Sequence, residues 1–389
     1  MDAEIRLREW TPSAPLSLSA GSLRELAELG HLLEIRPAAG GRWTLRPKGI
    51  VGRLQLSEGT LDLLPKHPIA NLCRMIAAVA EVPRLFDDMV AMDEGTLPDL
   101  LIAAFIERAE ALVTAGLRRD YVEQRERLAV LRGRLDLPAH LRRPEVLITD
   151  LSCRHEDYTF DNPFNTVLRQ TAEACHSRWP ALAVRGRRLR HRLASLARAD
   201  MQPADIDRVR YDRLTEPYRP VHGLCRLIIA GTRLGLGARR SPGAGFVVEM
   251  APLFERFVSH SLRARLRAPW RVELQDETSL DDGGAIVLRP DIVVYLGDRV
   301  VAVLDAKYKL RSGGAPASDD AYQALAYARR HGLRRSWLVF PDRPQGTALH
   351  TTHDRANEIA AYGLDLGAEW TEVELALDRL AEAVRGREP

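Results

Sequence analysis

The stretch that most constrains the fold is RPDIVVYLGDRVVAVLDAKYK, residues 289–309. Val, Ile, Leu and Tyr fill both halves, and the Gly-Asp pair between them predicts two strands joined by a tight turn. Side chains alternate between the two faces of a strand, so one face of the second half mixes valines with charges: Val301, Val303, Asp305, Lys307 and Lys309. A buried charge is costly unless it is paired or binds a metal, so this face predicts a functional site.

Size and composition place the chain among ordinary globular proteins. Its 389 residues suffice for two or three domains, with 46% hydrophobic and 28% charged residues. A net charge of +3 means that any affinity for nucleic acid must come from local basic patches. The four scattered cysteines predict neither disulfides nor a zinc cluster, and no apolar run has the length of a membrane span. We therefore expect a soluble, cytoplasmic protein without membrane contact.

The order of predicted elements indicates an α+β or α/β multidomain protein. Residues 1–100 begin as a β-rich region, and residues 101–235 are mainly helical, although 126–137 look β-like. The glycine-rich segment 231–245 is the best candidate for a joint. Within 246–389 we expect a helix from Pro252, three strands, a helix from Asp319 and a strand at 335–341, which together make a mixed sheet flanked by helices.

Asp291, Asp305 and Lys307 are the candidate catalytic residues. Mg²⁺ prefers oxygen ligands, is held by one or two carboxylates and leaves its other positions for water and phosphate. Two aspartates on adjacent strands meet that need, and a neighbouring lysine can stabilise charge on a phosphate. Glu255 lies on the inward stripe of its predicted helix and is a third candidate ligand. The alternative to a catalytic site is that Asp305 and Lys307 form an exposed ion pair on an edge strand.

Gln323 and Tyr327 are four residues apart, so they share one face of the predicted helix from Asp319. Such a polar pair can hold a metal ligand or a phosphate in place. Two weaker signals are open to ordinary interpretations: His350 and His353 as surface histidines, and Arg132 and Arg134 as part of a plain β-turn rather than a charged tip. The basic helix expected at 185–198 is either a solvated face of a bundle or a phosphate-tracking surface.

The register of the hairpin decides whether the two aspartates can share an ion. A regular two-residue loop at Gly297-Asp298 would set Asp291 opposite Leu304, on the face away from Asp305. A three-residue loop would set Asp291 opposite Val303, diagonal to Asp305 at about 7–8 Å. We therefore predict an odd-length loop or a β-bulge between Pro290 and Asp305, with the valine face turned toward the metal and Glu255.

The order Glu255, Pro290-Asp291, Asp305-Ala306-Lys307, Gln323-x-x-x-Tyr327 resembles the PD-(D/E)XK nuclease superfamily. Five further segments resemble the McrC family: EGTLDLLPKHPIANLCRMIAAVA, YVEQRERLAVLRGRLD, DNPFNTVLRQ, MAPLFERFV and VLDAKYK…YQALAYA. McrC proteins are the nuclease subunits of McrBC-type, modification-dependent restriction systems that act in anti-phage defence. The resemblance implies a Mg²⁺- or Mn²⁺-dependent endonuclease acting on modified double-stranded DNA, with Asp291, Asp305 and Glu255 as metal ligands, and Lys307 and Gln323 completing the catalytic set.

The same resemblance implies a partner, a McrB-like hexameric AAA+ GTPase, on which the N-terminal half would dock and which it would stimulate. The chain itself has no G-x-x-x-x-G-K-[ST] phosphate-binding loop. Two alternatives stay open. One is a non-cleaving adaptor that mainly activates the AAA+ partner, and the other is a stand-alone repair or recombination nuclease of the same superfamily.

Overall fold

The computed structural model describes residues 3–56, 59–81, 97–142, 150–175, 180–236, 245–281, 283–309, 311, 315–343 and 346–386. The chain divides into two compact units. One combines Met1–Leu100 with Gly231–Pro389, and the other is Leu101–Ala230. Among the described residues, no helix has both the length and the apolar character that crossing a membrane requires.

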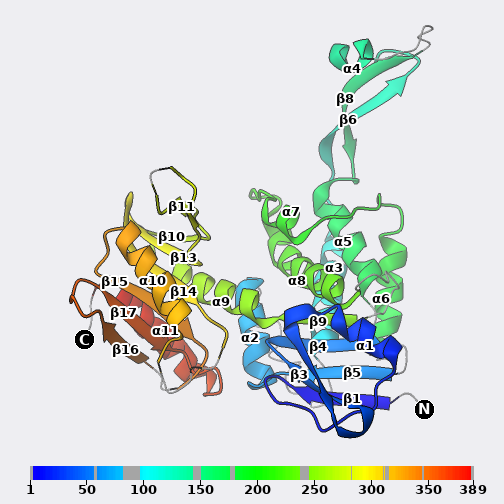
Figure 1. Ribbon diagram of the computed structural model, residues 1–389. Helices are drawn as coiled ribbons and strands as arrows, with labels where there is room; N and C mark the ends of the chain where they lie inside the picture. Colours follow the sequence, from blue (N-terminus) through cyan, green and yellow to red (C-terminus); the bar gives the residue numbers. More distant parts are fainter. Residues whose placement is uncertain are drawn as a thin grey trace. The chain divides into compact units, whose positions relative to one another are not determined.

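A four-stranded sheet organises the N-terminal part of the first unit (Figure 1). Its order is β1 (Ala3–Arg8), β5 (Gly59–Leu64), β4 (Ile50–Leu56), β9 (Gly245–Glu249). β1 and β5 are parallel, and the other pairs are antiparallel. Leucines from this sheet, from the hairpin β2 (Leu33–Ala38) and β3 (Arg42–Pro47), and from α1 (Ala20–Ala27) form one core. The β-rich character expected for the N-terminal region is therefore present.

The glycine-rich segment 231–245, the expected joint, lies only partly within the described residues. Its first six residues complete helix α8 (Arg219–Leu236), residues 237–244 lie outside the described residues, and Gly245 opens β9. Position 231 requires glycine, because a Cβ there would lie 2.5 Å from Phe246 Cε2 and 2.6 Å from Val247 O. The glycine thus permits close packing of α8 on β9. Residues 246–249, placed with the C-terminal region from the sequence, pair with the N-terminal sheet.

A six-stranded mixed sheet forms the rest of the first unit, in the order β10-β13-β14-β15-β17-β16. The strands are β10 (Trp270–Leu274), β13 (Ile292–Leu296), β14 (Arg299–Ala306), β15 (Arg335–Phe340), β16 (Gly346–Thr351) and β17 (Glu358–Gly363). β14, β15 and β17 run parallel, with antiparallel strands at both edges. A small hairpin, β11 (Thr278–Ser279) and β12 (Val287–Leu288), is inserted before β13.

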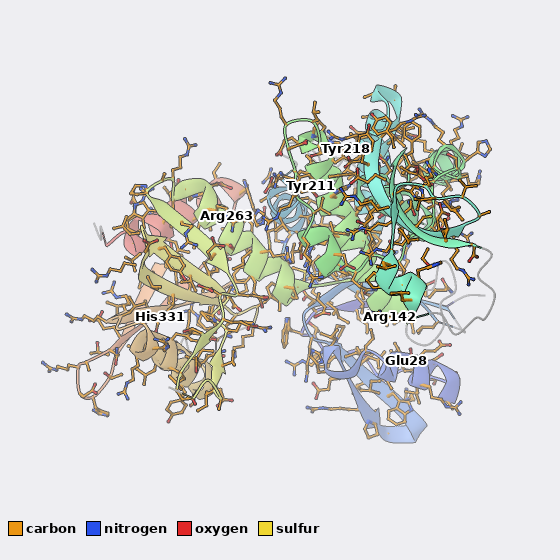
Figure 2. The ribbon with its side chains drawn as sticks, turned by 90° about the horizontal axis from the view of Figure 1, so that it is seen from above. Glu28, Arg142, Tyr211, Tyr218, Arg263 and His331 are labelled. Carbon is orange, nitrogen blue, oxygen red and sulfur yellow. The ribbon has the colours of Figure 1, made fainter. Side chains whose placement is uncertain are left out.

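Helices cover both faces of this sheet. α10 (Ser318–Arg330) packs Ala324 against Leu338 and Phe340 on one face. On the opposite face, Tyr362 Oη donates to the carbonyl oxygen of Ala376 in α11 (Trp370–Val384) at 2.6 Å. α9 (Met250–Arg265) lies beside α11 and α2 (Ile69–Val79), and its Arg263 donates to Val272 O of β10 at 2.9 Å (Figure 2). The mixed sheet flanked by helices agrees with the sequence prediction.

The second unit is helical apart from one projecting ribbon (Figure 1). Its helices are α3 (Leu97–Ala115, which begins in the first unit), α5 (Pro163–Ala174), α6 (Pro180–Arg192), α7 (Pro203–Asp207) and α8. The ribbon consists of β6 (Asp120–Leu128), β8 (Leu151–Thr159), β7 (Arg134–Leu135) and the short α4 (Leu137–Leu141). The leucines of the basic segment 185–198 are buried, as in a bundle helix, while Arg187 and Arg188 are exposed.

Candidate functional site

A β-bulge sets the register of the β13–β14 hairpin. Leu296 faces Arg299, so the loop has two residues, and of the two predicted alternatives the odd-length loop is absent. One step later the pairing changes from Tyr295↔Val300 to Val294↔Ala302, which leaves Val301 as an extra residue. The prediction of a bulge between Pro290 and Asp305 is therefore confirmed. Continued past Ile292↔Leu304, the same register sets Asp291 directly opposite Asp305, and not diagonal to it.

The carboxylate of each aspartate accepts a hydrogen bond from the backbone of the opposite segment. Ala306 N donates to Asp291 Oδ2 at 2.8 Å, and Asp291 N donates to Asp305 Oδ1 at 3.4 Å. Asp305 is 1% exposed, on a strand that has neighbours on both sides. The alternative of an exposed ion pair on an edge strand is therefore wrong. Two carboxylates instead face the same side of the sheet at the end of β14.

Burial and neighbouring negative charges disfavour the ionised forms of Asp291 and Glu255. Burial, with the charges of Asp305 and Glu255, raises the pKa of Asp291 to about 8. Burial also raises the pKa of Glu255 to about 7, although Lys307 opposes that rise. Asp291 resists ionisation because it is largely removed from water and has acidic neighbours. A cation bound beside it would therefore stabilise its anionic form.

Lys307 is held by a chain of polar contacts. Its Nζ lies 2.6 Å from Asp305 Oδ2 and donates to Gln323 Oε1 at 3.0 Å. Gln323 Nε2 donates to Tyr327 Oη at 2.8 Å. Tyr327 Oη in turn donates to the carbonyl oxygen of Arg289, two residues before Asp291, at 3.0 Å. These contacts thus link Asp305 on β14, through α10, to the segment that precedes β13.

The protonation of Lys307 follows from these neighbours. Burial lowers its pKa, but the charges of Asp305, Asp291 and Asp320 outweigh burial, so the pKa is raised overall. Its ammonium group therefore stays charged across the physiological range. Lys309, the next lysine along the chain, does not join the site, because its Nζ pairs with Asp320 Oδ2 at 2.5 Å.

The structure brings most of the predicted residues together. Asp291, Asp305, Lys307 and Gln323 are joined by direct contacts, while Glu255, half-buried on α9, acts on them through charge. Val303 of the valine face packs against Tyr327 of α10; that this face turns toward Glu255 stays a prediction. The sequence did not indicate the backbone carbonyl of Arg289, which anchors Tyr327.

A divalent cation fits the chemistry of the acid pair. Within the described residues, no three His, Cys, Asp or Glu side chains form a ready-made metal cage. Mg²⁺ needs no such cage, because it usually takes one or two carboxylates and keeps water and phosphate as its other ligands. Two adjacent carboxylates, with Asp305 buried and Asp291 half-buried with a strongly raised pKa, match that requirement. His350 lies on β16 and His353 in the following turn, away from this sheet end.

Fold and site together define an α+β protein with a mixed sheet in which Asp305 on β14, Lys307 directly after β14 and Asp291 directly before β13 lie together. The sequence model described as "McrBC 5-methylcytosine restriction system component" matches residues 45–341, about three quarters of the chain. The chain belongs to this McrBC family. No curated protein matches the sequence.

The solved structures that resemble the chain include two from Thermococcus gammatolerans. One is a chain of a refined half-complex from a tetradecameric assembly of McrB AAA+ hexamers with bound McrC. It has a TM-score of 0.58 and 19% identity, covering 98% of this chain and 100% of that one. The other belongs to the cryo-EM structure of the McrBC complex, with a TM-score of 0.42, 19% identity, and coverage of 68% and 88%. The first likeness supports a shared fold.

Proposed function

We propose that this chain is the nuclease subunit of a McrBC-like restriction system, a metal-dependent endonuclease of the PD-(D/E)XK type that cleaves modified double-stranded DNA. The observation that carries the proposal is the pair Asp291 and Asp305, which are directly opposed, with Asp305 buried and contacted by a charged lysine. Family membership supports the restriction system, and the mixed sheet with flanking helices is compatible with the superfamily fold.

Each side chain has a role that follows from its contacts. Asp291 and Asp305 would hold Mg²⁺ or Mn²⁺, with Glu255 adding negative charge nearby. When bound, the ion would polarise the phosphate and lower the pKa of a bound water. Lys307 supplies a fixed positive charge for the phosphate, where negative charge builds up during hydrolysis. Gln323 orients the Lys307 ammonium through the 3.0 Å hydrogen bond, which limits its motion.

The proposed partner is an AAA+ NTPase, by analogy with the Thermococcus assembly of McrB hexamers with bound McrC. The ribbon of the second unit is a candidate contact surface. Apolar side chains at its far end are more than half exposed: Val130 (76%), Leu131 (52%), Leu137 (52%) and Leu141 (72%). Clustered exposed apolar groups of this kind mark protein interaction sites. Arg132, in the loop before β7, pairs with Asp157 of β8, which leaves it less free to act as a charged tip.

The test is a reconstituted reaction containing the full chain, an AAA+ partner from the same restriction locus, methylated duplex DNA, nucleotide and Mg²⁺. Lys307→Ala should abolish cleavage and leave the stimulation of nucleotide hydrolysis unchanged, because the substitution removes only a charge at the sheet end. Wild-type chain that stimulates hydrolysis but never cuts DNA would instead establish the adaptor function. Cleavage without any partner would favour the stand-alone nuclease.

A further inference from the structure

Tyr308 connects the end of the catalytic strand to the N-terminal sheet. It follows Lys307 directly, and Lys309 N donates to Lys307 O at 2.8 Å, which makes Tyr308 the centre of a three-residue turn. Lys307 N donates to Val339 O at 2.8 Å, so Lys307 itself still belongs to the sheet. The turn directs the ring of Tyr308 into the interior, where it is 5% exposed.

The hydroxyl group of Tyr308 donates to Glu9 Oε2 at 3.2 Å, across 299 positions of sequence. Glu9 directly follows β1, is 2% exposed, and extends the sheet through a hydrogen bond from its N to Leu64 O at 3.0 Å. The same Glu9 oxygen accepts a hydrogen bond from Lys66 N at 3.1 Å. Glu9 is therefore fixed to both β1 and the residue pair that follows β5.

Two further contacts enclose the ring. Lys66 Nζ lies 4.3 Å from the centroid of the Tyr308 ring, within the range of a cation–π interaction. The ring of Phe254, adjacent to Glu255 on α9, lies 5.9 Å from that of Tyr308, centroid to centroid. Tyr308 thus contacts the N-terminal sheet on one side and the helix that carries Glu255 on the other.

Burying the charged groups of Glu9 and Lys66 lowers the stability of the fold. Burial raises the pKa of Glu9 to about 7 and lowers that of Lys66. Lys66 Nζ and Glu9 Oε1 are buried without a hydrogen-bond partner among the described residues. Apolar side chains of similar volume would fill such a site at lower free-energy cost. A role in positioning accounts for the polar groups better than a role in stability.

We infer that Glu9 and Tyr308 are positioning residues for Lys307: the hydrogen bond between them fixes the strand end from the N-terminal sheet and so sets the place of the catalytic ammonium. The inference rests on the proposed nuclease function. Adjacent Cα atoms are about 3.8 Å apart, so a shift of Tyr308 moves Lys307 almost equally. A misplacement of about 1 Å can reduce a catalytic rate on the order of a hundredfold.

The experiment compares four variants of the full chain in the reconstituted cleavage reaction: Tyr308→Phe, Glu9→Ala, Glu9→Gln and Tyr362→Phe. Tyr308→Phe removes one hydroxyl and keeps the ring. Glu9→Gln keeps an oxygen that can accept both hydrogen bonds, whereas Glu9→Ala does not. Tyr362→Phe is the matched control, since it removes a similarly buried tyrosine hydrogen bond, to Ala376 O, on a strand that β15 separates from β14.

Tyr308→Phe and Glu9→Ala should lower kcat roughly ten- to a hundredfold with KM for DNA unchanged, and Glu9→Gln should retain most of the wild-type kcat. Tyr362→Phe should lower the thermal midpoint and leave kcat unchanged. A wild-type kcat for Tyr308→Phe, or a Glu9→Gln as slow as Glu9→Ala, would overturn the inference. If Lys307→Ala cleaves DNA normally in the same assay, the nuclease proposal fails, and not only the positioning inference. If Glu9→Ala does not fold, the result for Tyr308→Phe tests the inference.

Discussion

The carboxylate of Asp305 accepts a hydrogen bond from Asp291 N at 3.4 Å, and that of Asp291 accepts one from the neighbour of Asp305, Ala306 N, at 2.8 Å. Each backbone thereby fixes the side chain that faces it, and the two carboxylates are held together despite their repulsion. This arrangement depends on the extra residue Val301, because without the bulge the aspartates would lie on opposite faces of the sheet.

Metal binding should depend on pH through Asp291. Its pKa is about 8 in the folded chain and near 4 when unfolded, so the folded state holds an extra proton between these values. The metal-free protein should therefore lose stability as pH rises through this window, and Mg²⁺ should raise the thermal midpoint more at pH 8.5 than at pH 5.5.

Asp291→Asn provides the check on that account, with Glu273→Gln on the edge strand β10 as the control. The Asn variant should lose both the pH-dependent destabilisation and the Mg²⁺-induced shift in thermal midpoint, whereas the control should keep both. An unchanged Mg²⁺ shift in Asp291→Asn would place the ion elsewhere.

Glu255 is predicted to assist cleavage without being indispensable. It influences Asp291 through charge, and its pKa of about 7 reflects burial beside the acid pair. Glu255→Gln, measured in single-turnover cleavage, should reduce the rate on the order of a hundredfold. A wild-type rate would restrict the site to Asp291, Asp305 and Lys307.

His222 should make the second unit sensitive to acid. Tyr211 Oη lies 2.8 Å from its Nδ1 and Phe164 O lies 3.0 Å from its Nε2, within the aromatic cluster that includes Tyr218 (Figure 2). Burial lowers the pKa of His222 from 6.5 to about 4, so the unfolded chain binds the extra proton between these values. Stability from this group is therefore complete above pH 6.5 and is lost toward pH 4.

The corresponding measurement is the free energy of unfolding against pH for the wild-type chain and His222→Gln. The wild type should lose about 3 kcal/mol more than the variant between pH 7 and pH 4. Parallel curves would show that His222 is protonated in the folded unit.

Gly231 should tolerate no side chain. In Gly231→Ala the new Cβ would meet Phe246 Cε2 at 2.5 Å and Val247 O at 2.6 Å, and backbone must move to relieve the second contact. We expect a loss of about 1–3 kcal/mol in denaturant unfolding. Gly186→Ala, also helical but with its nearest neighbour at 3.4 Å, should be neutral or slightly stabilising. Equal effects at the two positions would contradict close packing of α8 on β9.

Much of the C-terminal sheet could be predicted from the sequence, since its strands and helices have strong local patterns. The alternation at 299–306 and the helical spacing of Gln323 and Tyr327 led to elements that the structure contains. The acids and the lysine were found because charged groups on an apolar face need a chemical reason. Local pattern and residue chemistry therefore sufficed for the candidate catalytic set.

Other features depend on distant parts of the chain, so local patterns do not reveal them. Of the two predicted alternatives, the bulge at Val301 and not an odd-length loop shifts the register, because the register is decided by which residues the core accepts. β9 joins a sheet whose other strands lie before residue 65, and Tyr308 contacts Glu9 from the opposite end of the chain. Neither pairing leaves a local signal in the sequence.

The central claim, that the opposed aspartates carry out DNA cleavage, is tested most directly by the single-turnover cleavage rate of Asp305→Asn in Mg²⁺ with the AAA+ partner present. The substitution keeps the shape of the side chain and removes its charge. The account predicts a loss of at least about a thousandfold, with Glu273→Gln cutting at the wild-type rate and both variants equally folded. Cleavage by Asp305→Asn at the wild-type rate would contradict the assignment of the site.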